Sequence, residues 1–415
     1  MSLAVTGALL EGEAVGLRVE EGLIAELGPG VESRDDDEML DAGGAPLIPG
    51  LVNGHTHAAM TLFRGYGDDL PLMQWLEEKI WPLEAKMEPE DVYWGTRLAC
   101  LEMIRSGTVR FWDMYWHPEA TARAVEDAGL RATIAAPLIE TGKGLESLRE
   151  DALRSLEQFA SRGERISAAL APHAIYTVGE EGLRWVAELA AQRDLPVHVH
   201  LSETEGEVAE CVNEHGLRPA QYLDRLGVLG PGALLAHGVW LDDEELELAA
   251  ERGATIVTNP VANLKLAVGR VFPYRKARDA GVAIGLGTDG AGSNNSLDLL
   301  ADLKTFALLQ KNEARDPAAV SAEEAWEVAT GRLAPLLGAS GRLAPGEPAD
   351  FLLLRADSSE LSLGNLTADL VYAAAGAVVD TCVVAGRVLM RGGSVEGADE
   401  VIAKAVERAR GLGLA

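Results

Sequence analysis

The residues of this sequence most suited to chemistry are histidines at the ends of short apolar runs. Asp289 ends a further run, Ala-Ile-Gly-Leu-Gly-Thr-Asp-Gly. Imidazoles and a carboxylate together bind a divalent transition metal ion, most often zinc, with iron or manganese as alternatives. Such an ion makes hydroxide available from water near neutral pH, so the set is typical of metal-assisted hydrolysis. Six of the eight histidines are placed in this way: His55, His57, His173, His198, His200 and His237.

The spacing of the histidines indicates which of them share one ion. His55 and His57 lie two residues apart, and a strand of period two turns both side chains to the same side. His198 and His200 share a face for the same reason. We expect His200, nearer the end of its run, to be the ligand, and His198 to be either a buried, hydrogen-bonded histidine or a residue that lines the barrel more deeply. A lone His-x-His pair is common by chance, so the prediction depends on the complete set.

Glu203 lies three residues after His200, just past the same apolar run. A carboxylate at that place can reach a substrate beside the metal ion and transfer protons to and from it. The alternative is a structural role, because Ser202-Glu203-Thr204-Glu205 also has the composition of a helix N-terminus, where acidic residues are favoured. We expect Glu203 to be catalytic.

The elements that must position these residues follow from an alternation of apolar runs and amphipathic segments. Helical patterns such as Glu181–Arg193 and Asp242–Arg252 separate most of the runs. Eight runs alternating with helices predict an α/β fold, a (β/α)8 TIM barrel over residues 50–340, with its chemistry at the C-terminal ends of the strands. The runs are Leu47–Val52, Thr108–Trp112, Ala132–Leu138, Ile166–Ala171, Pro196–Val199, Ala233–Ala236, Thr255–Val257 and Val282–Leu286.

The two ends of the chain have a different sequence pattern from the middle. Residues 1–49 alternate short apolar runs with glycines and acidic turns, which predicts a meander of strands. Residues 341–415 return to turns and strands and finish in a helical pattern over Asp399–Leu412. We expect both ends to build one small β-sandwich domain together, with the terminal helix packed on the surface.

The composition limits the class of protein. Hydrophobic residues make up 47% of the 415 residues, enough for a large core. The net charge is 36 − 65 = −29, which disfavours nucleic acid and anionic membranes as partners. Cys100, Cys211 and Cys382 form no CxxC pair. With a poor signal peptide and no long apolar stretch, these features predict a cytoplasmic protein.

Taken with their flanks, the site residues resemble the amidohydrolase superfamily, in the branch of S-adenosylhomocysteine and 5′-methylthioadenosine deaminases. The resemblance implies a one-metal hydrolase that releases ammonia from a small adenosine-like molecule. Ala171-Pro172-His173 stands where two-metal relatives have a lysine ligand, in agreement with one ion. The matching stretches are Pro-Gly-Leu-Val-Asn-Gly-His-Thr-His-Ala-Ala-Met-Thr-Leu-Phe-Arg-Gly, Ala-Pro-His-Ala-Ile-Tyr-Thr, His-Leu-Ser-Glu-Thr, Asn-Pro-Val-Ala-Asn-Leu-Lys-Leu and Gly-Thr-Asp-Gly-Ala-Gly-Ser-Asn-Asn-Ser-Leu-Asp.

The resemblance also implies a role for each site residue. His237 would hydrogen-bond the attacking water or the attacked centre. Glu203 would carry the proton of that water to the ring nitrogen beside the attacked carbon, and Asp289 would help to deliver a proton to the departing ammonia. The residues that would bind one zinc ion are His55, His57, His200 and Asp289.

Three further residues resemble substrate contacts of this family, beside Glu203. Trp75, in Pro-Leu-Met-Gln-Trp-Leu, resembles a wall that packs on the substrate, with an ordinary helix core residue as the alternative. Glu84 resembles the carboxylate that holds ribose hydroxyls, with a surface helix acid as the alternative. His173 resembles a histidine that contacts the base.

One departure from the family concerns the group at the 5′ position. Relatives that use S-adenosylhomocysteine tend to have an arginine after the third strand and another in the next loop. This chain has Ala135-Ala136-Pro137 at the first place and only Lys143 near the second. A charged hydrogen bond to the homocysteine carboxylate is worth about 1.5–3 kcal/mol. We therefore expect an uncharged 5′ group, as in adenosine, 5′-methylthioadenosine or 5′-deoxyadenosine, ahead of S-adenosylhomocysteine.

Two other functions fit parts of the pattern. A relative that acts on a triazine, guanine-like or pterin ring would have the same metal site, although a flat ring has no use for Glu84. A non-catalytic barrel that only binds a ligand would not need the full set of hydrolytic groups. Many relatives form homo-oligomers, and the sequence itself carries no interface signature.

Overall fold

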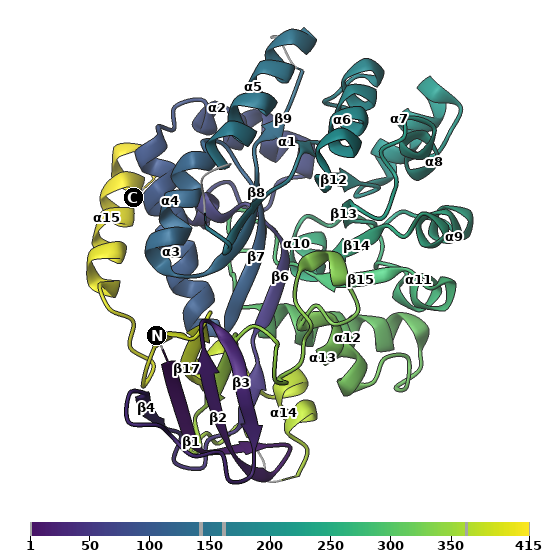
Figure 1. Ribbon diagram of the computed structural model, residues 1–415. Helices are drawn as coiled ribbons and strands as arrows, with labels where there is room; N and C mark the ends of the chain where they lie inside the picture. Colours follow the sequence, from purple (N-terminus) through teal and green to yellow (C-terminus); the bar gives the residue numbers. More distant parts are fainter. Residues whose placement is uncertain (1, 141–143, 160–162, 362–363, 415) are drawn as a thin grey trace.

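The computed structural model describes residues 2–414 except 141–143, 160–162 and 362–363. Parallel strands form its centre, in two four-stranded sheets of order β10-β8-β7-β6 and β12-β13-β14-β15 (Figure 1). Each strand overlaps one of the predicted apolar runs. The strands are β6 (Leu51–Thr56), β7 (Thr108–Met114), β8 (Arg131–Ala135), β10 (Ile166–Ala168), β12 (Val197–Leu201), β13 (Ala233–His237), β14 (Thr255–Thr258) and β15 (Ala283–Leu286). A short parallel pair, β9 (Pro137–Leu138) and β11 (Ala171–Pro172), follows β8 and β10.

Hydrogen bonds connect the two parallel sheets on both sides. The N–H of Leu170 donates to the carbonyl of Pro196 at 2.9 Å, and the N–H of His198 donates to the carbonyl of Leu170 at 2.8 Å. On the other side, the N–H of Asp289 donates to the carbonyl of His55 at 3.0 Å. These bonds bring the C-terminal ends of β6, β12 and β15 close together.

Helices follow most of the parallel strands and lie outside them (Figure 1). The two helices predicted from periodicity are α6 and α9, each within one residue of its expected bounds. The side chain of Asp242 accepts the N–H of Glu245 at the start of α9, and Gly253, with φ of +70°, ends it. The outer helices are α3 (Pro89–Ser106), α4 (Pro118–Ala128), α5 (Gly144–Phe159), α6 (Glu180–Arg193), α7 (Glu205–His215), α8 (Pro219–Arg225), α9 (Asp243–Arg252), α11 (Tyr274–Ala280), α12 (Leu299–Ala314) and α13 (Ala322–Ala329).

Strands from both chain ends form two further four-stranded sheets, and one hydrophobic cluster joins them. Leu3 and Leu17 from the first sheet and Phe351 and Val383 from the second are all buried in that cluster. The order of the first sheet is β3 (Leu23–Gly28), β2 (Glu13–Glu20), β1 (Ser2–Leu10) and β4 (Glu38–Asp41); that of the second is β18 (Arg387–Met390), β17 (Val379–Val384), β16 (Phe351–Leu354) and β5 (Leu47–Pro49).

The run Leu47–Val52, expected to be one strand, is divided at Gly50. Residues before Gly50 form β5, which pairs antiparallel with β16, and residues after it begin β6. A Cβ atom on Gly50 would lie 2.3 Å from a methyl carbon of Val109. Only glycine fits this close approach, so the chain passes here from one sheet to the other.

Several shorter helices lie between the longer elements. One segment contains α1 (Leu72–Trp75), η2 (Leu76–Ile80) and α2 (Trp81–Glu84), which follow one another directly. The others are η1 (Ala58–Phe63), α10 (Pro260–Lys265), η3 (Pro335–Leu337), α14 (Leu366–Tyr372) and η4 (Gly376–Val378).

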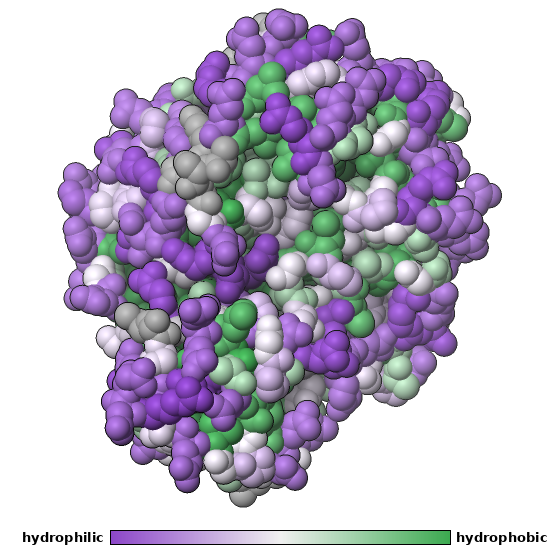
Figure 2. Space-filling model, viewed as in Figure 1, coloured by the Kyte–Doolittle hydropathy of each residue, from purple (hydrophilic) through white to green (hydrophobic). Residues whose placement is uncertain are grey.

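The terminal helix α15 (Ala398–Gly411) packs beside α3, and its bounds lie within one residue of the helical pattern Asp399–Leu412 (Figure 1). Arg408 on α15 pairs with Asp91 on α3, with Nε 2.6 Å from the carboxylate. Hydrophilic residues dominate the face in Figure 2, and hydrophobic residues show mainly in its recesses. Among the described residues, every helix is too short or too polar to cross a lipid bilayer.

Candidate active site

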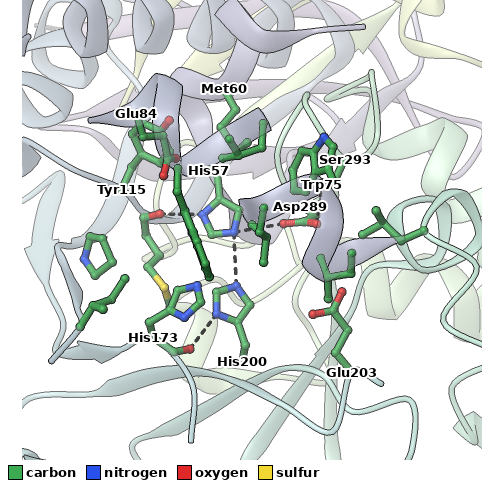
Figure 3. Close-up of a pocket in the computed structure, with 18 of the residues that line it drawn as sticks. His57, Met60, Trp75, Glu84, Tyr115, His173, His200, Glu203, Asp289 and Ser293 are labelled. Carbon is green, nitrogen blue, oxygen red and sulfur yellow. Dashed lines mark hydrogen bonds and ion pairs between the residues drawn. The ribbon is translucent and has the colours of Figure 1, made fainter. Parts of the chain in front are cut away.

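The structure brings His55, His57, His200, His237 and Asp289 together at the C-terminal ends of the parallel strands. Figure 3 shows His57, His200 and Asp289 of this cluster. Nε2 of His57 lies 3.3 Å from Nε2 of His200. Oδ1 of Asp289 lies 3.2 Å from Nε2 of His57 and 3.4 Å from Nε2 of His55. His237 belongs to an overlapping group, with a ring nitrogen within 4.8 Å of the ligand atoms of His55 and Asp289.

Hydrogen bonds from the Nδ1 atoms fix the orientation of two of the imidazoles, those of His57 and His200. Nδ1 of His57 donates to the carbonyl of Met114 at 2.7 Å, and Nδ1 of His200 donates to the carbonyl of His173 at 2.8 Å. A carbonyl oxygen only accepts hydrogen bonds, so each ring in its neutral form carries its proton on Nδ1. The unprotonated Nε2 atoms then face one another, which is the arrangement of imidazoles that share a metal ion.

His198 acts on the site through His55. Its Nε2 lies 2.8 Å from Nδ1 of His55, and the ring is fully buried, as expected for a hydrogen-bonded histidine behind the ligands. Within the described residues, Nε2 of His55 and Oδ1 of Asp289 are buried without a hydrogen-bond partner. Buried polar atoms are ordinarily paired. A metal ion bound by both atoms would account for them, and imidazole nitrogens with a carboxylate oxygen suit zinc.

The electrostatics of the cluster favour a bound positive charge. Burial lowers the pKa of His55 to about 4 and that of His200 well below its usual value, so both rings are neutral. Burial also lowers the pKa of His57, but the hydrogen bond and charge of Asp289 and the carbonyl of Met114 outweigh it and raise that pKa to about 9. The raised pKa of His57 shows that its place beside the ionised Asp289 favours a positive charge, and a bound metal ion would take the place of that proton.

Three site residues other than glycine have left-handed backbone, with φ of +51° at Ser202, +75° at His237 and +61° at Asp289. This conformation is uncommon for residues with a Cβ atom and tends to gather at functional sites. His237 ends β13, and Asp289 follows β15. The side chain of Asp289 is fixed further by Ser293, whose hydroxyl donates to Oδ2 at 2.6 Å.

Glu203 lies just past β12, beside His237. Its Oε1 is 3.8 Å from Nδ1 of His237, which also lies 2.8 Å from the side-chain oxygen of Asn263. Glu203 is 5% exposed, and burial raises the pKa of its carboxyl. A carboxyl with a raised pKa accepts and releases protons more readily near neutral pH.

Glu207, which the sequence reasoning did not single out, holds the turn that carries Glu203. Its two carboxylate oxygens accept the backbone N–H groups of Ser202 and Glu203, both at 2.8 Å. Glu207 is buried, and burial raises its pKa to about 7. The signal for it was present in Thr204-Glu205-Gly206-Glu207, a Thr-x-x-Glu pattern in which the glutamate folds back over the helix start.

The cluster faces a cavity of about 680 Å³, counting the space open to solvent. Trp75, Glu84 and His173, the three expected substrate contacts, all line it together with Glu203 and Asp289 (Figure 3). A mostly apolar cavity with a few polar groups is typical of a small-molecule site. Apart from His55, the metal and substrate residues predicted from sequence therefore line one cavity.

The three substrate candidates are held by local contacts. Nε1 of Trp75 donates to the carbonyl of Tyr66 at 3.4 Å, and the ring is buried. Oε2 of Glu84 accepts a bond from the indole of Trp116 at 3.1 Å, and burial raises the pKa of Glu84. Burial also lowers the pKa of His173 to about 3, so this ring is neutral.

Three further aromatic residues of the cavity wall, besides Trp75, were not predicted from sequence. Tyr115 and Trp116 follow β7 directly and line the cavity, as does Trp81 on α2. At the places of the two missing arginines, Ala136 lies between β8 and β9, and Lys143 lies outside the described residues.

Comparisons with known proteins agree with this site. Residues 47–389 match the model of the amidohydrolase family. The chain is 46% identical over 402 residues to a 5′-deoxyadenosine deaminase of Methanoregula boonei, covering 94% of this chain and 90% of that protein. It is 43% identical over 403 residues to a 5-methylthioadenosine/S-adenosylhomocysteine deaminase of Archaeoglobus fulgidus, covering 95% and 94%.

A solved structure shows the same arrangement of the chain. The crystal structure of an adenosine deaminase from Xanthomonas campestris with bound zinc superposes with a TM-score of 0.92 at 33% identity, covering 100% of this chain and 98% of that one. The family match, the two relatives and this fold agree with the motifs in the sequence. This chain belongs to the amidohydrolase family.

Proposed function

We propose that this protein is a metal-dependent deaminase that releases ammonia from the adenine ring of adenosine-like nucleosides and leaves the inosine analogue. One observation carries the proposal. Among the described residues, Nε2 of His55 and Oδ1 of Asp289 are buried without a hydrogen-bond partner, and Asp289 lines the same cavity as Glu203 and Glu84. The deaminase names of the relatives from Methanoregula boonei and Archaeoglobus fulgidus support the same reaction.

His55, His57, His200 and Asp289 would hold one divalent ion. Zinc is our first choice because these nitrogen and oxygen donors suit it and because zinc is bound in the Xanthomonas campestris structure. Iron and manganese are the alternatives. When bound, such an ion supplies the Lewis acidity that makes hydroxide available from water near neutral pH.

Glu203, His237 and Asp289 would manage the protons of the reaction. Glu203 takes a proton from the attacking water and gives it to the ring nitrogen beside the attacked carbon, while His237 hydrogen-bonds the attacking oxygen. A carbon–oxygen bond forms, and the carbon–nitrogen bond to the amino group then breaks. Asp289 passes the second proton of the water to the amino group, which leaves as ammonia. The raised pKa of Glu203 suits its part in this transfer.

The substrate we propose is a riboside with an uncharged 5′ group, such as adenosine, 5′-methylthioadenosine or 5′-deoxyadenosine. Trp75 would pack on the substrate, His173 would contact the base, and Glu84 would hold the ribose hydroxyls. Glu84 lines the cavity and is buried only in part, so its carboxylate is available to a ligand. This position supports a riboside over a triazine, guanine-like or pterin ring.

We also infer the architecture that supports the site. The hydrogen bonds on both sides of the two parallel sheets support a closed (β/α)8 barrel over residues 50–340. The shared hydrophobic cluster supports one small β-sandwich domain built from residues 1–49 and 341–415. Opening of the barrel on one side would separate Asp289 from His55 and disperse the metal ligands.

Ammonia release by the zinc-loaded protein tests the proposal. The panel contains adenosine, 5′-methylthioadenosine, 5′-deoxyadenosine, S-adenosylhomocysteine, guanine and melamine. We expect turnover of the three uncharged adenosines, with S-adenosylhomocysteine poorer. If guanine or melamine is turned over and none of the adenosines is, the nucleoside assignment is wrong. The protein would then still be a metal-dependent hydrolase, with another substrate.

A further inference from the structure

Lys265 joins two turns that lie against the indole of Trp75. It is the last residue of α10, and the reaction proposed above does not use it. Its Nζ donates to Oδ1 of Asp68 at 2.6 Å and to the carbonyl of Gly292 at 3.1 Å. A third bond, of 2.7 Å, goes to the side-chain oxygen of Asn295. One ammonium group therefore uses its three donors to connect the turn after η1 with the turn after β15.

The two turns approach different rings of the indole. A Cβ atom on Gly67, the residue before Asp68, would lie 3.3 Å from Cδ1 of the five-membered ring. A Cβ atom on Gly292 would lie 3.2 Å from Cζ2 of the six-membered ring. The carbonyl of Tyr66 also accepts the indole N–H, at 3.4 Å. The place of the Trp75 ring therefore depends on how these two turns are held relative to each other.

The turn that contains Asp68 has little burial of its own to hold it. Residues 64–74 are all exposed or half-buried, whereas Trp75 is 5% exposed. A segment with little burial opens locally at low cost, so its bonds to the rest of the barrel matter. Arg64 fixes the start of the segment by a bond to the carbonyl of Asn295. The bond that Asp68 accepts fixes its middle.

The surroundings of the ion pair between Lys265 and Asp68 favour its persistence. The two side chains are 24% and 33% exposed, so water screens their attraction only in part. The hydrogen bond from Lys265 lowers the pKa of Asp68, and the carboxylate is therefore ionised at neutral pH. Nδ2 of Asn295 donates to Oδ2 of the same carboxylate at 3.2 Å. Both oxygens of Asp68 are thus bound to residues outside its own turn.

We propose that Lys265 is a positioning residue, which holds the indole of Trp75 in place for packing on the nucleoside by joining Asp68 to Gly292. The proposal rests on the proposed function, because Trp75 packs on the substrate there. Lys265 does not line the cavity of the metal cluster. Packing by Trp75 acts on the bound substrate and on the transition state alike, so its loss should raise KM and leave kcat nearly unchanged.

Lys265→Met tests the proposal in the zinc-loaded full chain, with ammonia release from 5′-deoxyadenosine as the assay. Methionine keeps an unbranched stem and removes the three donors. KM should rise between about threefold and thirtyfold, because a charged hydrogen bond is lost at a partly exposed place. Asp68→Ala, at an exposed residue, removes the partner instead and should raise KM likewise, even where Lys265→Met is unstable. The matched control is Lys304→Met on α12, at an exposed lysine, and it should change neither constant.

A double-variant cycle shows whether Lys265 acts through Trp75. Trp75→Ala should raise KM by itself, and adding Lys265→Met to it should raise KM less than about twofold further, because the ring to be positioned is gone. If the two effects multiply, Lys265 acts by another route and the proposal is overturned. An unchanged KM in both Lys265→Met and Asp68→Ala would overturn it as well. So would a fall in kcat with loss of metal, because Lys265 would then act on Asp289 through the turn that contains Gly292.

The outcomes separate this inference from the proposed function. If the unchanged protein releases no ammonia from adenosine or 5′-deoxyadenosine, the proposed function fails, and this inference fails with it. If both nucleosides are deaminated and the effects of Lys265→Met and Trp75→Ala multiply, the function stands and Lys265 does not position Trp75.

Discussion

Glu207 is predicted to control turnover although it does not line the substrate cavity. Its carboxylate accepts the backbone N–H groups of Ser202 and Glu203, both at 2.8 Å. The perturbation is Glu207→Gln, which keeps the size of the side chain. A glutamine has one acceptor oxygen, and its NH2 group would face one of the two backbone N–H groups as a second donor.

The magnitude follows from that loss. One buried N–H group is left without an acceptor, which costs about 1–3 kcal/mol. The cost falls on the turn that carries Glu203, so it favours conformations in which that carboxylate is displaced. Since 1.36 kcal/mol corresponds to a factor of ten, kcat should fall between about fivefold and a hundredfold. KM should change little, because the residues that bind the substrate stay in place.

The assay is steady-state ammonia release from 5′-deoxyadenosine at about pH 8.5. This pH is chosen because burial raises the pKa of Glu207 to about 7, and the ionised carboxylate has both oxygens free to accept. Metal content and the melting temperature are measured beside it. The matched control is Glu210→Gln, since Glu210 is an exposed residue of the same helix.

The split between kcat and KM decides the outcome. A kcat within twofold of the unchanged protein, at equal metal content, would refute the reasoning. A loss of metal in Glu207→Gln that accounts for the whole loss of turnover would also refute it, because the effect would then not pass through Glu203. An equal effect in Glu210→Gln would show that charge loss on α7 is sufficient.

Three further predictions address the metal-assisted reaction, and a fourth addresses stability. Glu203→Gln should keep its metal and lose about 10²–10⁴-fold in kcat/KM; unchanged turnover would exclude Glu203 as the proton carrier. Glu84→Ala should reduce kcat/KM for adenosine more than for free adenine, and equal losses would remove Glu84 from the ribose site. Chelation should abolish ammonia release and lower the melting temperature, with zinc restoring both; full activity of metal-free protein would contradict the metal site. The hydrogen bond from Arg18 lowers the pKa of Asp37 from 3.8 to about 2, so the stability it contributes is present above pH 3.8 and lost as pH falls toward 2. Asp37→Asn should reduce the fall in the free energy of unfolding between pH 3.8 and about 2, as measured by urea unfolding. An unchanged fall in the variant would disprove this prediction.

Local patterns were sufficient to predict the strands and several site residues. The pair His55 and His57 was predicted to share a side because the period of a strand is two, and a single centre contains both rings. Helices α6 and α9 were predicted from their apolar spacing and their end residues. Such features depend on a few neighbours in the chain, so a sequence shows them directly.

Contacts between distant residues could not be predicted in this way. Val109 leaves no room for a Cβ atom at Gly50, where the chain passes between the sheets, and nothing near Gly50 in the sequence indicates that contact. The cavity of the metal cluster likewise combines α1, α2, β9 and residues that follow β7 and β12. Its shape depends on how these elements pack.

The sequence by itself determined the chemistry that this protein could perform, because imidazole and carboxylate side chains at strand ends bind metals wherever the strands converge. The tertiary structure alone decided which partner each supporting group contacts. His198 supports His55 across 143 positions of the chain, and Glu207 supports Glu203 by folding back over a turn. The reason is geometric: a hydrogen bond is decided by distance and direction in space, and residue order specifies neither for partners far apart.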